Sequence, residues 1–257
     1  MSTHPPKRPY PLYPAAYFAE SPTYDAWVKL TAADVHSLQS EKGFEGQRVY
    51  FYLNHPIRFV RIVGVVIAID DINLKYTVLT IDDGSGANIE LKIIRIPPAI
   101  QDPVDTSSNT AIDNVNIISR CGVFDVTVDN QALDIGSVVK AKCTISEFRG
   151  IKQLELKRVS LIATTNEEAQ AWAEAAAFKQ DILSRPWHVS PEKQKEIEDS
   201  IKLREKKAQE YQKQRMKYEA KKREQRRKKE LYYAQREERL ELRRRKEEIE
   251  MNAGALI

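Results

Sequence analysis

The chain has 257 residues, with 41 Lys and Arg against 37 Asp and Glu and only two cysteines. Cys121 and Cys143 have no close spacing, which argues against a disulfide framework and a zinc site and favours buried thiols in a reducing compartment. The longest apolar stretch, residues 62–69, is far shorter than the roughly 20 residues of a membrane helix. Length and composition therefore favour a soluble intracellular chain with one folded domain and an extended tail.

The basic residues concentrate in the C-terminal part of the chain. Residues 191–250 hold 22 Lys and Arg against 15 Asp and Glu, whereas the rest of the chain holds 19 against 22. The part expected to fold as a domain is therefore slightly acidic. Net charge alone does not predict strong phosphate binding by that domain.

Two N-terminal segments precede the first clear strand pattern. Residues 1–22 hold six prolines, which predict an extended, proline-rich arm without a helix. Residues 23–39 combine spaced apolar side chains, Trp27 among them, with Thr31 and Asp34 three positions apart. That spacing is typical of a helix cap and predicts a short helix here.

Residues 56–161 show β-branched runs separated by turn residues, which is the pattern of a small all-β domain. Gly64 lies inside the first run, where a missing side chain permits the bend that closes a small barrel. A tight turn at 71–73 and a glycine-containing loop at 83–86 join the first three strands. The five predicted strands are residues 57–69, 75–82, 88–96, 137–148 and 153–162.

The order of these strands indicates the fold class. Residues 99–134, rich in Asp, Ser, Asn and Thr, predict a long loop with one weak strand at 123–128. Three strands, a gap and two further strands is the order of an OB-fold, a mainly β, five-stranded Greek-key barrel. The chain is therefore expected to fold as an OB-fold with flanking α-helices.

Two helical segments follow the last strand. A helix at 166–184, capped by Thr165 or Asn166, completes a domain that spans 23–187. Residues 188–257 form a charged tail without the apolar content of a further folded domain. Within that tail we expect one long solvated α-helix, whose apolar positions keep no heptad.

Two motifs carry a resemblance to a known family. Residues 51–57 read Phe-Tyr-Leu-Asn-His-Pro-Ile, and residues 82–86 read Asp-Asp-Gly-Ser-Gly. In this order and spacing they resemble the Stn subunit of the CST telomere-capping complex (Cdc or Ctc, Stn and Ten), fungal type, a family related to the middle subunit of replication protein A. The resemblance covers roughly residues 10–185. It implies an OB-fold protein of the nucleus that acts at the telomeres of chromosomes.

Both motifs also have a physical interpretation that needs no ligand. His55 followed by Pro56 fixes the direction in which the chain enters the barrel, so a structural role for His55 is favoured over a ligand role. One of Asp82 and Asp83 is expected to cap the turn through its backbone amides, and a metal site there is disfavoured.

The resemblance implies single-stranded DNA binding. In an OB-fold the nucleic acid crosses strands two and three, between the loop that joins strands one and two and the loop that joins strands four and five. The basic hairpin 149–152 is the strongest candidate, although single members of the set can be solvated or core positions. The candidates are Tyr76 and Phe148 for base stacking, and Lys75, Lys92, Arg149 and Lys152 for phosphates. We expect weak, salt-sensitive binding that needs partners.

The resemblance also implies protein partners. The helix after strand five is expected to pack against a small Ten-type OB-fold subunit in a heterodimer, with Trp172 as anchor, although Trp172 can instead pack on its own barrel. A large CST subunit and DNA polymerase alpha-primase are further implied partners. Many family members carry winged-helix domains after the barrel, and this tail lacks the pattern for them. The candidate interface residues are Ala169, Trp172, Ala173, Ala176 and Leu183 on one face, with Phe178 and Ile182 on an adjoining one.

Other interpretations remain open at this point. With four histidines and no nucleophile motif, phosphate loop or metal-ligand cluster, we expect no enzyme activity, no metal and no cofactor. A general subunit similar to replication protein A, or an adaptor that makes only protein contacts, would have nearly the same fold. The tail is a solvated spacer, a nucleic-acid arm centred on residues 221–229, or a nuclear localisation signal.

Overall fold

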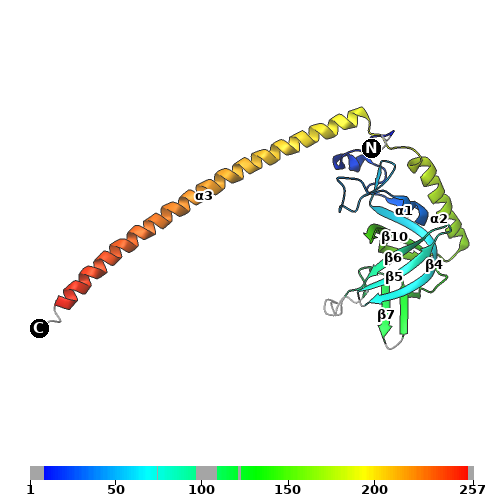
Figure 1. Cartoon of the computed structure of the whole chain (residues 1–257), viewed down its shortest axis with the longest axis horizontal. Helices are drawn as coiled ribbons and strands as arrows, with labels where there is room; N and C mark the ends of the chain where they lie inside the picture. The colour runs from blue at the N-terminus through cyan, green and yellow to red at the C-terminus, as the bar shows by residue number, and fades with distance from the viewer. Residues whose placement is uncertain (1–8, 74, 97–108, 121–122, 254–257) are drawn as a thin grey trace, which may run out of the picture. The chain divides into compact units, whose positions relative to one another are not determined.

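The computed structural model describes residues 9–73, 75–96, 109–120 and 123–253 (Figure 1). The chain divides into two units, residues 1–191 and 192–257. The strands of the described residues all lie in the first unit. Among the described helices, none combines the length and the apolar character needed to cross a membrane.

Five strands of the first unit close into an OB-fold barrel. They are β4 Phe59–Asn73, β5 Tyr76–Asp82, β6 Asn88–Ile94, β10 Val138–Phe148 and β11 Ile151–Leu161. β4 pairs antiparallel with β10 and with β5, β10 with β11, and β11 runs parallel to β6, which pairs with β5. The five predicted strands are confirmed, with shifts of a few residues at their ends.

The barrel interior follows from the alternation of side chains along each strand. In β5 and β6 every second residue is buried, and the residues between them face outward. Cys143 on β10 is fully buried, as predicted, and burial raises the pKa of its thiol. Cys121 lies outside the described residues. The inward row includes Leu79, Ile81, Leu91, Ile93 and Ile145, each less than 2 % exposed.

Gly64 stands where β4 changes partners. β4 pairs with β10 through residues 59–65 and with β5 from residue 65 onward. A Cβ atom on Gly64 would lie 2.5 Å from the carbonyl oxygen of Asp82 and 2.6 Å from Cγ2 of Ile81. The predicted glycine corner is thus confirmed, and its physical reason is the close approach of β5.

The segment before the barrel is only partly helical. The helix α1, Ala32–Ser37, begins at the predicted cap: Asp34 N–H donates to Thr31 Oγ1 at 3.2 Å, and Thr31 N–H donates to Asp34 Oδ2 at 3.4 Å. Trp27, however, belongs to the short strand β1, Trp27–Lys29, which runs parallel to β4. The prediction that Trp27 lies in a helix is therefore wrong. Its backbone is extended because β1 pairs with β4, which follows about 30 residues later in the sequence.

The proline-rich arm holds a short 3₁₀ helix, η1, at Ala15–Glu20. The prediction of an arm without a helix is therefore wrong for these residues, which lie between Pro14 and Pro22. Phe18 is only 1 % exposed, and burial of its ring favours this helical turn. The centroid of its ring lies 5.2 Å from that of Phe44 and 5.9 Å from that of Phe51. Residues 1–8 lie outside the description.

A second sheet of three strands lies within the predicted long loop, of which residues 99–108 and 121–122 are outside the description. Strand β8, Val123–Val128, is the predicted weak strand, and it pairs antiparallel with β7, Val115–Arg120, and β9, Gln131–Ala132. Val115, Ile117 and Val126 from this sheet are buried in the same core as the barrel. The loop prediction is wrong for residues 115–120 and 131–132, because polar neighbours obscure their alternating apolar positions.

Two short strands carry the first sequence motif, and the β4–β5 turn lies later in the chain than predicted. β2, Tyr50–Tyr52, pairs antiparallel with β3, His55–Ile57. β4 continues to Asn73, whose Oδ1 accepts hydrogen bonds from the backbone N–H groups of Lys75 and Tyr76 at 2.8 and 3.0 Å. The turn predicted at 71–73 is therefore displaced toward residue 75.

The helix after β11 has two parts. α2, Thr165–Phe178, begins at Thr164, whose Oγ1 accepts the N–H of Glu167 at 3.3 Å, so the predicted caps Thr165 and Asn166 are wrong by one or two residues. A π-helical turn, η2, Lys179–Leu183, follows it. The hydrogen bond from Ser184 N–H to the Lys179 carbonyl, five residues back, changes the phase of the helix at this point.

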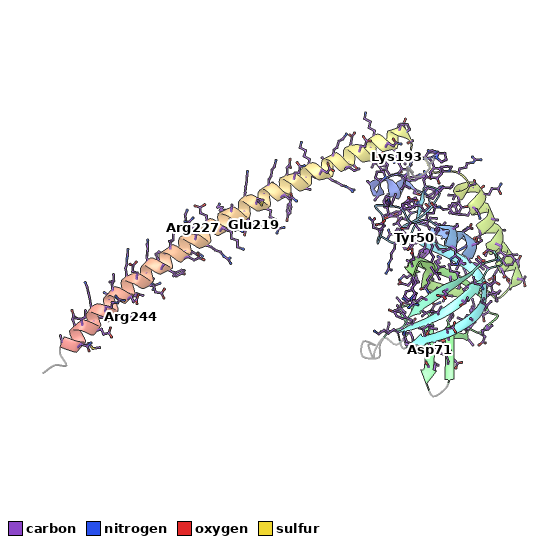
Figure 2. All side chains as sticks on the ribbon, viewed as in Figure 1. Tyr50, Asp71, Lys193, Glu219, Arg227 and Arg244 are labelled. Carbon is purple, nitrogen blue, oxygen red and sulfur yellow. The ribbon has the colours of Figure 1, made fainter. Side chains whose placement is uncertain are left out.

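The second unit consists mainly of one helix, α3, Pro191–Ala253, which begins at the boundary of the first. It has 63 residues and none of them is buried. At 1.5 Å per residue it is about 95 Å long. Side chains project from it along its whole length, among them Glu219, Arg227 and Arg244 (Figure 2).

Candidate functional site

The Asn-His-Pro motif holds the segment that follows α2. The Asn54 amide, 1 % exposed, donates to the carbonyls of Pro11 at 3.0 Å and Trp187 at 2.8 Å, and its Oδ1 accepts the N–H of Trp187 at 2.7 Å. His55 Nε2 donates to the carbonyl of Arg185 at 2.7 Å. The bonds to Trp187 and Arg185 join residues that are 133 and 130 positions apart in sequence. The favoured structural role of His55 agrees with these contacts.

His55 makes the first unit sensitive to pH. Burial lowers the pKa of its imidazole, against a smaller opposite effect of the Arg185 carbonyl, and Nδ1 is buried without a hydrogen-bond partner among the described groups. As pH falls through the ordinary histidine range, the unfolded chain gains a proton that the folded chain resists. The stabilising contribution is thus complete above about pH 6.5 and is lost below it.

We expect the free energy of unfolding to fall as pH decreases below about 6.5, and His55→Gln to remove part of that slope. Urea unfolding of both proteins above and below this pH measures the difference. The exposed His188 provides a matched control, because His188→Gln should leave the slope unchanged. Parallel profiles for wild type and His55→Gln would contradict the assignment.

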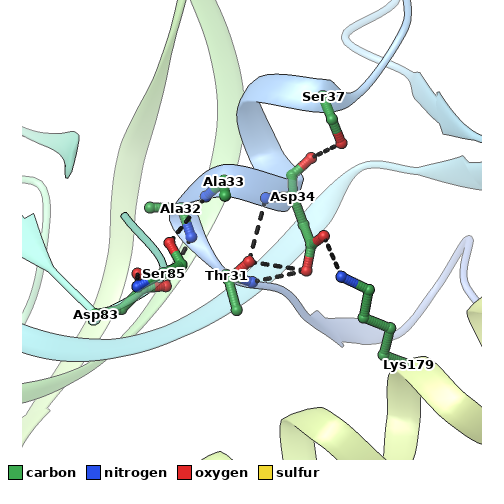
Figure 3. A network of polar contacts seen from close by, with 8 residues as sticks. All are labelled: Thr31, Ala32, Ala33, Asp34, Ser37, Asp83, Ser85 and Lys179. Carbon is green, nitrogen blue, oxygen red and sulfur yellow. Dashed lines mark hydrogen bonds and ion pairs between the residues drawn. The ribbon is translucent and has the colours of Figure 1, made fainter. Parts of the chain in front are cut away.

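The second motif joins the β5–β6 turn to α1 (Figure 3). Asp82 and Asp83 each accept a hydrogen bond from the backbone N–H two residues further on, at 2.9 and 3.0 Å, which confirms the predicted turn cap, made here by both residues. The second carboxylate oxygen of Asp83 accepts the N–H of Ala32 at 2.7 Å, and Ser85 Oγ accepts the N–H of Ala33 at 3.2 Å. Both sequence motifs therefore act through hydrogen bonds that position other elements.

Three of the DNA-binding candidates lie at one end of β6. Lys92 Nζ stands 3.9 Å above the ring of Tyr76, and Lys75 next to it is exposed. In the register Tyr76 is opposite Ile94, the last residue of β6. These three residues therefore form a basic and aromatic group beside the β4–β5 turn.

The other three candidates lie on the β10–β11 hairpin, near the beginning of β6. Phe148 is 57 % exposed, and the Arg149 guanidinium stands 5.1 Å above its ring. Lys152 is less free, because its Nζ donates to the carbonyl of His36 at 3.4 Å. The parallel pairing of Leu154 with Leu91 places this hairpin at the opposite end of β6 from Tyr76. The six residues thus form two groups rather than one cluster.

Acidic side chains separate the two groups. Glu155, opposite Lys92 on β11, forms ion pairs with Lys157 and, at 3.3 Å, with Arg48. Burial acts to raise the pKa of Glu155, but the hydrogen bond and charge of Lys157, with Arg48 and Lys92, hold it below its usual range. Arg48 was not predicted, since it belongs to a loop and reaches this surface only through tertiary structure.

The interface candidates on α2 and η2 divide into an inner and an outer set. Leu183 is buried in the core of the first unit, and Phe178 and Ile182 pack partly against it. The π turn explains Leu183, because it rotates this residue away from the face that a regular helix would give it. Trp172 is 51 % exposed. The exposed set is completed by three alanines: Ala169, Ala173 and Ala176.

Ion pairs fix α2 and η2 to the rest of the first unit. Glu174 lies 2.7 Å from Arg61 and 3.0 Å from Lys29, and hydrogen bonds from these two residues lower the pKa of its carboxyl. Lys179 lies 2.6 Å from Asp34, whose hydrogen bond raises the pKa of the lysine. The exposed face of α2 is therefore held in place by contacts on its other side.

A groove of about 290 Å³ runs beside this exposed face. Trp172 and Ala176 line it from α2, while Thr31, Asp83 and Ser85 line the opposite wall. Lys179 lines the groove next to these apolar residues, so the helix side combines apolar surface with one cation, and the other side carries hydroxyl and carboxylate groups. Helical periodicity in the sequence predicted the apolar residues of α2 that line the groove. The residues of the polar wall lie far from α2 in sequence, so no local pattern could predict that they face it.

Comparisons with known proteins agree on one family. The family described as telomere regulation protein Stn1 matches residues 4–253. Protein stn1 of Schizosaccharomyces pombe (strain 972 / ATCC 24843) is 26% identical over 163 residues, which are 63% of this chain and 41% of the relative. The CST complex subunit STN1 of Bos taurus is 24% identical over 181 residues, 68% of this chain and 47% of the relative. The chain thus spans less than half the length of these curated relatives.

A solved structure agrees with the fold. A chain from the crystal structure of yeast Stn1 and Ten1 superposes with a TM-score of 0.50 and 19% identity, over 74% of this chain and 91% of that chain. At this identity the likeness shows the fold alone. The family match, in contrast, extends over nearly the whole sequence, and the chain belongs to the telomere regulation protein Stn1 family.

Proposed function

We propose that this chain is a non-enzymatic telomere-capping subunit of the nucleus, which pairs with a small Ten-type OB-fold protein within a CST complex. The observation that carries the proposal is the half-exposed Trp172 on a helix whose other side is already packed. Large aromatic side chains at such positions are typical anchors of protein interfaces. Family membership and the solved pair of yeast Stn1 and Ten1 support a Ten-type protein as the occupant.

The rigidity of α2 and η2 favours this interface. The ion pairs of Glu174 and Lys179 order the helix before any partner arrives. Because a preordered surface loses little conformational entropy on binding, more of the contact energy appears as affinity. The groove next to Trp172 offers a partner the apolar surface of Trp172 and Ala176 and, on its opposite wall, the hydroxyl group of Ser85.

We further propose that the barrel binds single-stranded telomeric DNA across β5, β6 and β11. The exposed Phe148 with Arg149 at one end, and Tyr76 with Lys92 at the other, support this path because each end offers an aromatic ring and a cation. Glu90 on β6, which accepts a hydrogen bond from Gln153, and Glu155, opposite Lys92, make the surface electrostatically mixed. Binding by the chain alone is therefore weak, and the partner subunits supply the remaining affinity.

Reversing charge at both ends of this path tests the proposal. Lys92→Glu combined with Arg149→Glu should weaken binding of the full chain to telomeric single strands at least about tenfold, since two phosphate contacts become repulsive. Fluorescence anisotropy at several salt concentrations measures the affinity and its salt dependence. Lys140→Glu with Arg158→Glu is the matched control, because it changes the charge equally on β10 and β11 away from β5.

The outcome separates DNA binding from an adaptor role. Equal affinities of the test and control variants, with the chain alone and with its partner present, would contradict DNA binding by the barrel. An adaptor that makes only protein contacts would then be the better description. The observation that favours this second function is Glu155 on the same surface, because a carboxylate repels the phosphates of DNA.

A further inference from the structure

We propose that α3 carries a second nucleic-acid site, separate from the barrel, in which a stripe of basic and tyrosine side chains binds single-stranded DNA or RNA. Residues three or four positions apart lie on the same face of an α-helix. One such series runs through the middle of α3 and spans about 27 Å at 1.5 Å per residue. We call it the basic–tyrosine stripe: Arg215, Tyr218, Lys222, Arg226, Lys229 and Tyr233.

The acidic residues of this part of α3 lie beside or opposite the stripe rather than in it. Residues 211–236 hold 11 Lys and Arg against only three acidic residues, Glu219, Glu224 and Glu230. At about 100° per residue, Glu224 lies on the opposite side of the helix, whereas Glu219 and Glu230 lie about 20° and 40° beyond Arg226, at one edge of the stripe. The stripe itself therefore contains no carboxylate, and its other edge has none beside it in this part of the helix.

The ion pairs agree with this arrangement. Glu224 pairs with Lys228 at 2.7 Å, off the stripe, and Glu219 pairs with Arg215 at 3.0 Å at the end of the stripe. For Lys222, Arg226 and Lys229 the described part of the chain provides no carboxylate within ion-pair distance. The centre of the stripe therefore holds three uncompensated positive charges that suit a row of phosphates.

The tyrosines determine which nucleic acid fits best. Tyr218 is 67 % exposed and Tyr233 is 60 % exposed, although the Tyr233 ring has the ring of Tyr232 beside it, with centroids 5.9 Å apart. Neither ring is buried, because α3 has no buried residue. Aromatic rings beside a row of cations form a stacking platform for the bases of a single strand. In a duplex the bases are already stacked on one another, so the rings would have no counterpart. The stripe is therefore assigned to single strands.

Neutralising the stripe in the full chain tests this site. In Lys222→Gln/Arg226→Gln/Lys229→Gln, we expect the affinity for an oligothymidine single strand to fall at least about tenfold, and the slope of log affinity against log salt to become shallower by about 2. Glutamine is a good helix former, so α3 is retained, and far-ultraviolet circular dichroism verifies this. Tyr218→Leu/Tyr233→Leu should weaken binding without changing the salt slope.

The control keeps the charge and moves its position. Lys217→Gln/Lys221→Gln/Arg227→Gln removes two lysines and one arginine from the other faces of the same helix. It should bind several times more tightly than the stripe variant. Equal losses in the two variants would reduce the site to bulk charge and overturn the proposal, as would no loss in either. Preference of the wild type for the same sequence as a duplex would overturn the assignment to single strands.

The stripe is independent of the proposed barrel surface. Measured again in the Lys92→Glu/Arg149→Glu background, the stripe variant should still show its full loss. Failure of the barrel proposal therefore leaves this test intact, and failure of the stripe leaves the barrel test intact.

Discussion

Gly64→Ala is expected to destabilise the first unit by about 3 kcal/mol or more. The added methyl group would meet the Asp82 carbonyl oxygen at 2.5 Å and Ile81 Cγ2 at 2.6 Å. A backbone oxygen cannot rotate away as a flexible side chain can, so relief requires β4 and β5 to separate where the barrel closes. Because a domain of this size has roughly 5–15 kcal/mol of stability in total, a large fraction would be lost.

Urea unfolding of the full chain, with the midpoint and slope analysed together, measures this loss. Gly136→Ala is the matched control. Gly136 has a φ of +95° and no atom near its added Cβ, so alanine there carries only the cost of the left-handed backbone, about 1–2 kcal/mol. A loss for Gly64→Ala no larger than for Gly136→Ala would show that β5 does not approach β4 as closely as described.

Trp172→Ala is expected to weaken the heterodimer with a Ten-type partner by about 2 kcal/mol or more, close to thirtyfold in Kd. The side chain is 51 % exposed in the chain alone and borders the groove beside α2. Its loss should therefore change the stability of the isolated chain little, because half of its surface already faces solvent. Titration calorimetry of the purified partners measures the affinity.

Phe148→Ala provides the comparison for that experiment. Phe148 is exposed to a similar degree, 57 %, but lies on the β10–β11 hairpin. In the absence of DNA it should leave the heterodimer affinity unchanged. Phe178→Ala is a poor test of the interface, since Phe178 packs against the core and its removal would destabilise the chain itself. Equal effects of Trp172→Ala and Phe148→Ala would remove Trp172 from the interface.

The barrel could be predicted from sequence because its strands bury one face each. Alternation of apolar and polar residues is then imposed along β5, β6 and β10, and the five strands were found at nearly their true ends. The elements that were missed depend on distant partners. Trp27 extends because it pairs with β4, and β7 forms because β8 lies beside it. The amino-acid pattern of each segment alone does not predict either pairing.

The candidate site was predictable only in part. Helical periodicity grouped Trp172 with its neighbouring alanines, which are exposed in the structure, but the π turn, which has no sequence signature, places Leu183 in the core. Likewise the Asn-His-Pro motif was readable as an entry to the barrel, whereas its bonds to residues 185–187 join distant parts of the chain. Arg48 reached the barrel surface by the same kind of long-range contact.

The central claim is that this chain is one half of a stable pair with a small OB-fold protein, and the mass of the assembled species tests it most directly. The full chain is co-expressed with candidate small OB-fold proteins of the same nucleus, purified, and measured by light scattering after size exclusion. We predict a one-to-one complex that persists at micromolar concentration. A folded chain that remains a monomer with every such candidate would contradict the claim.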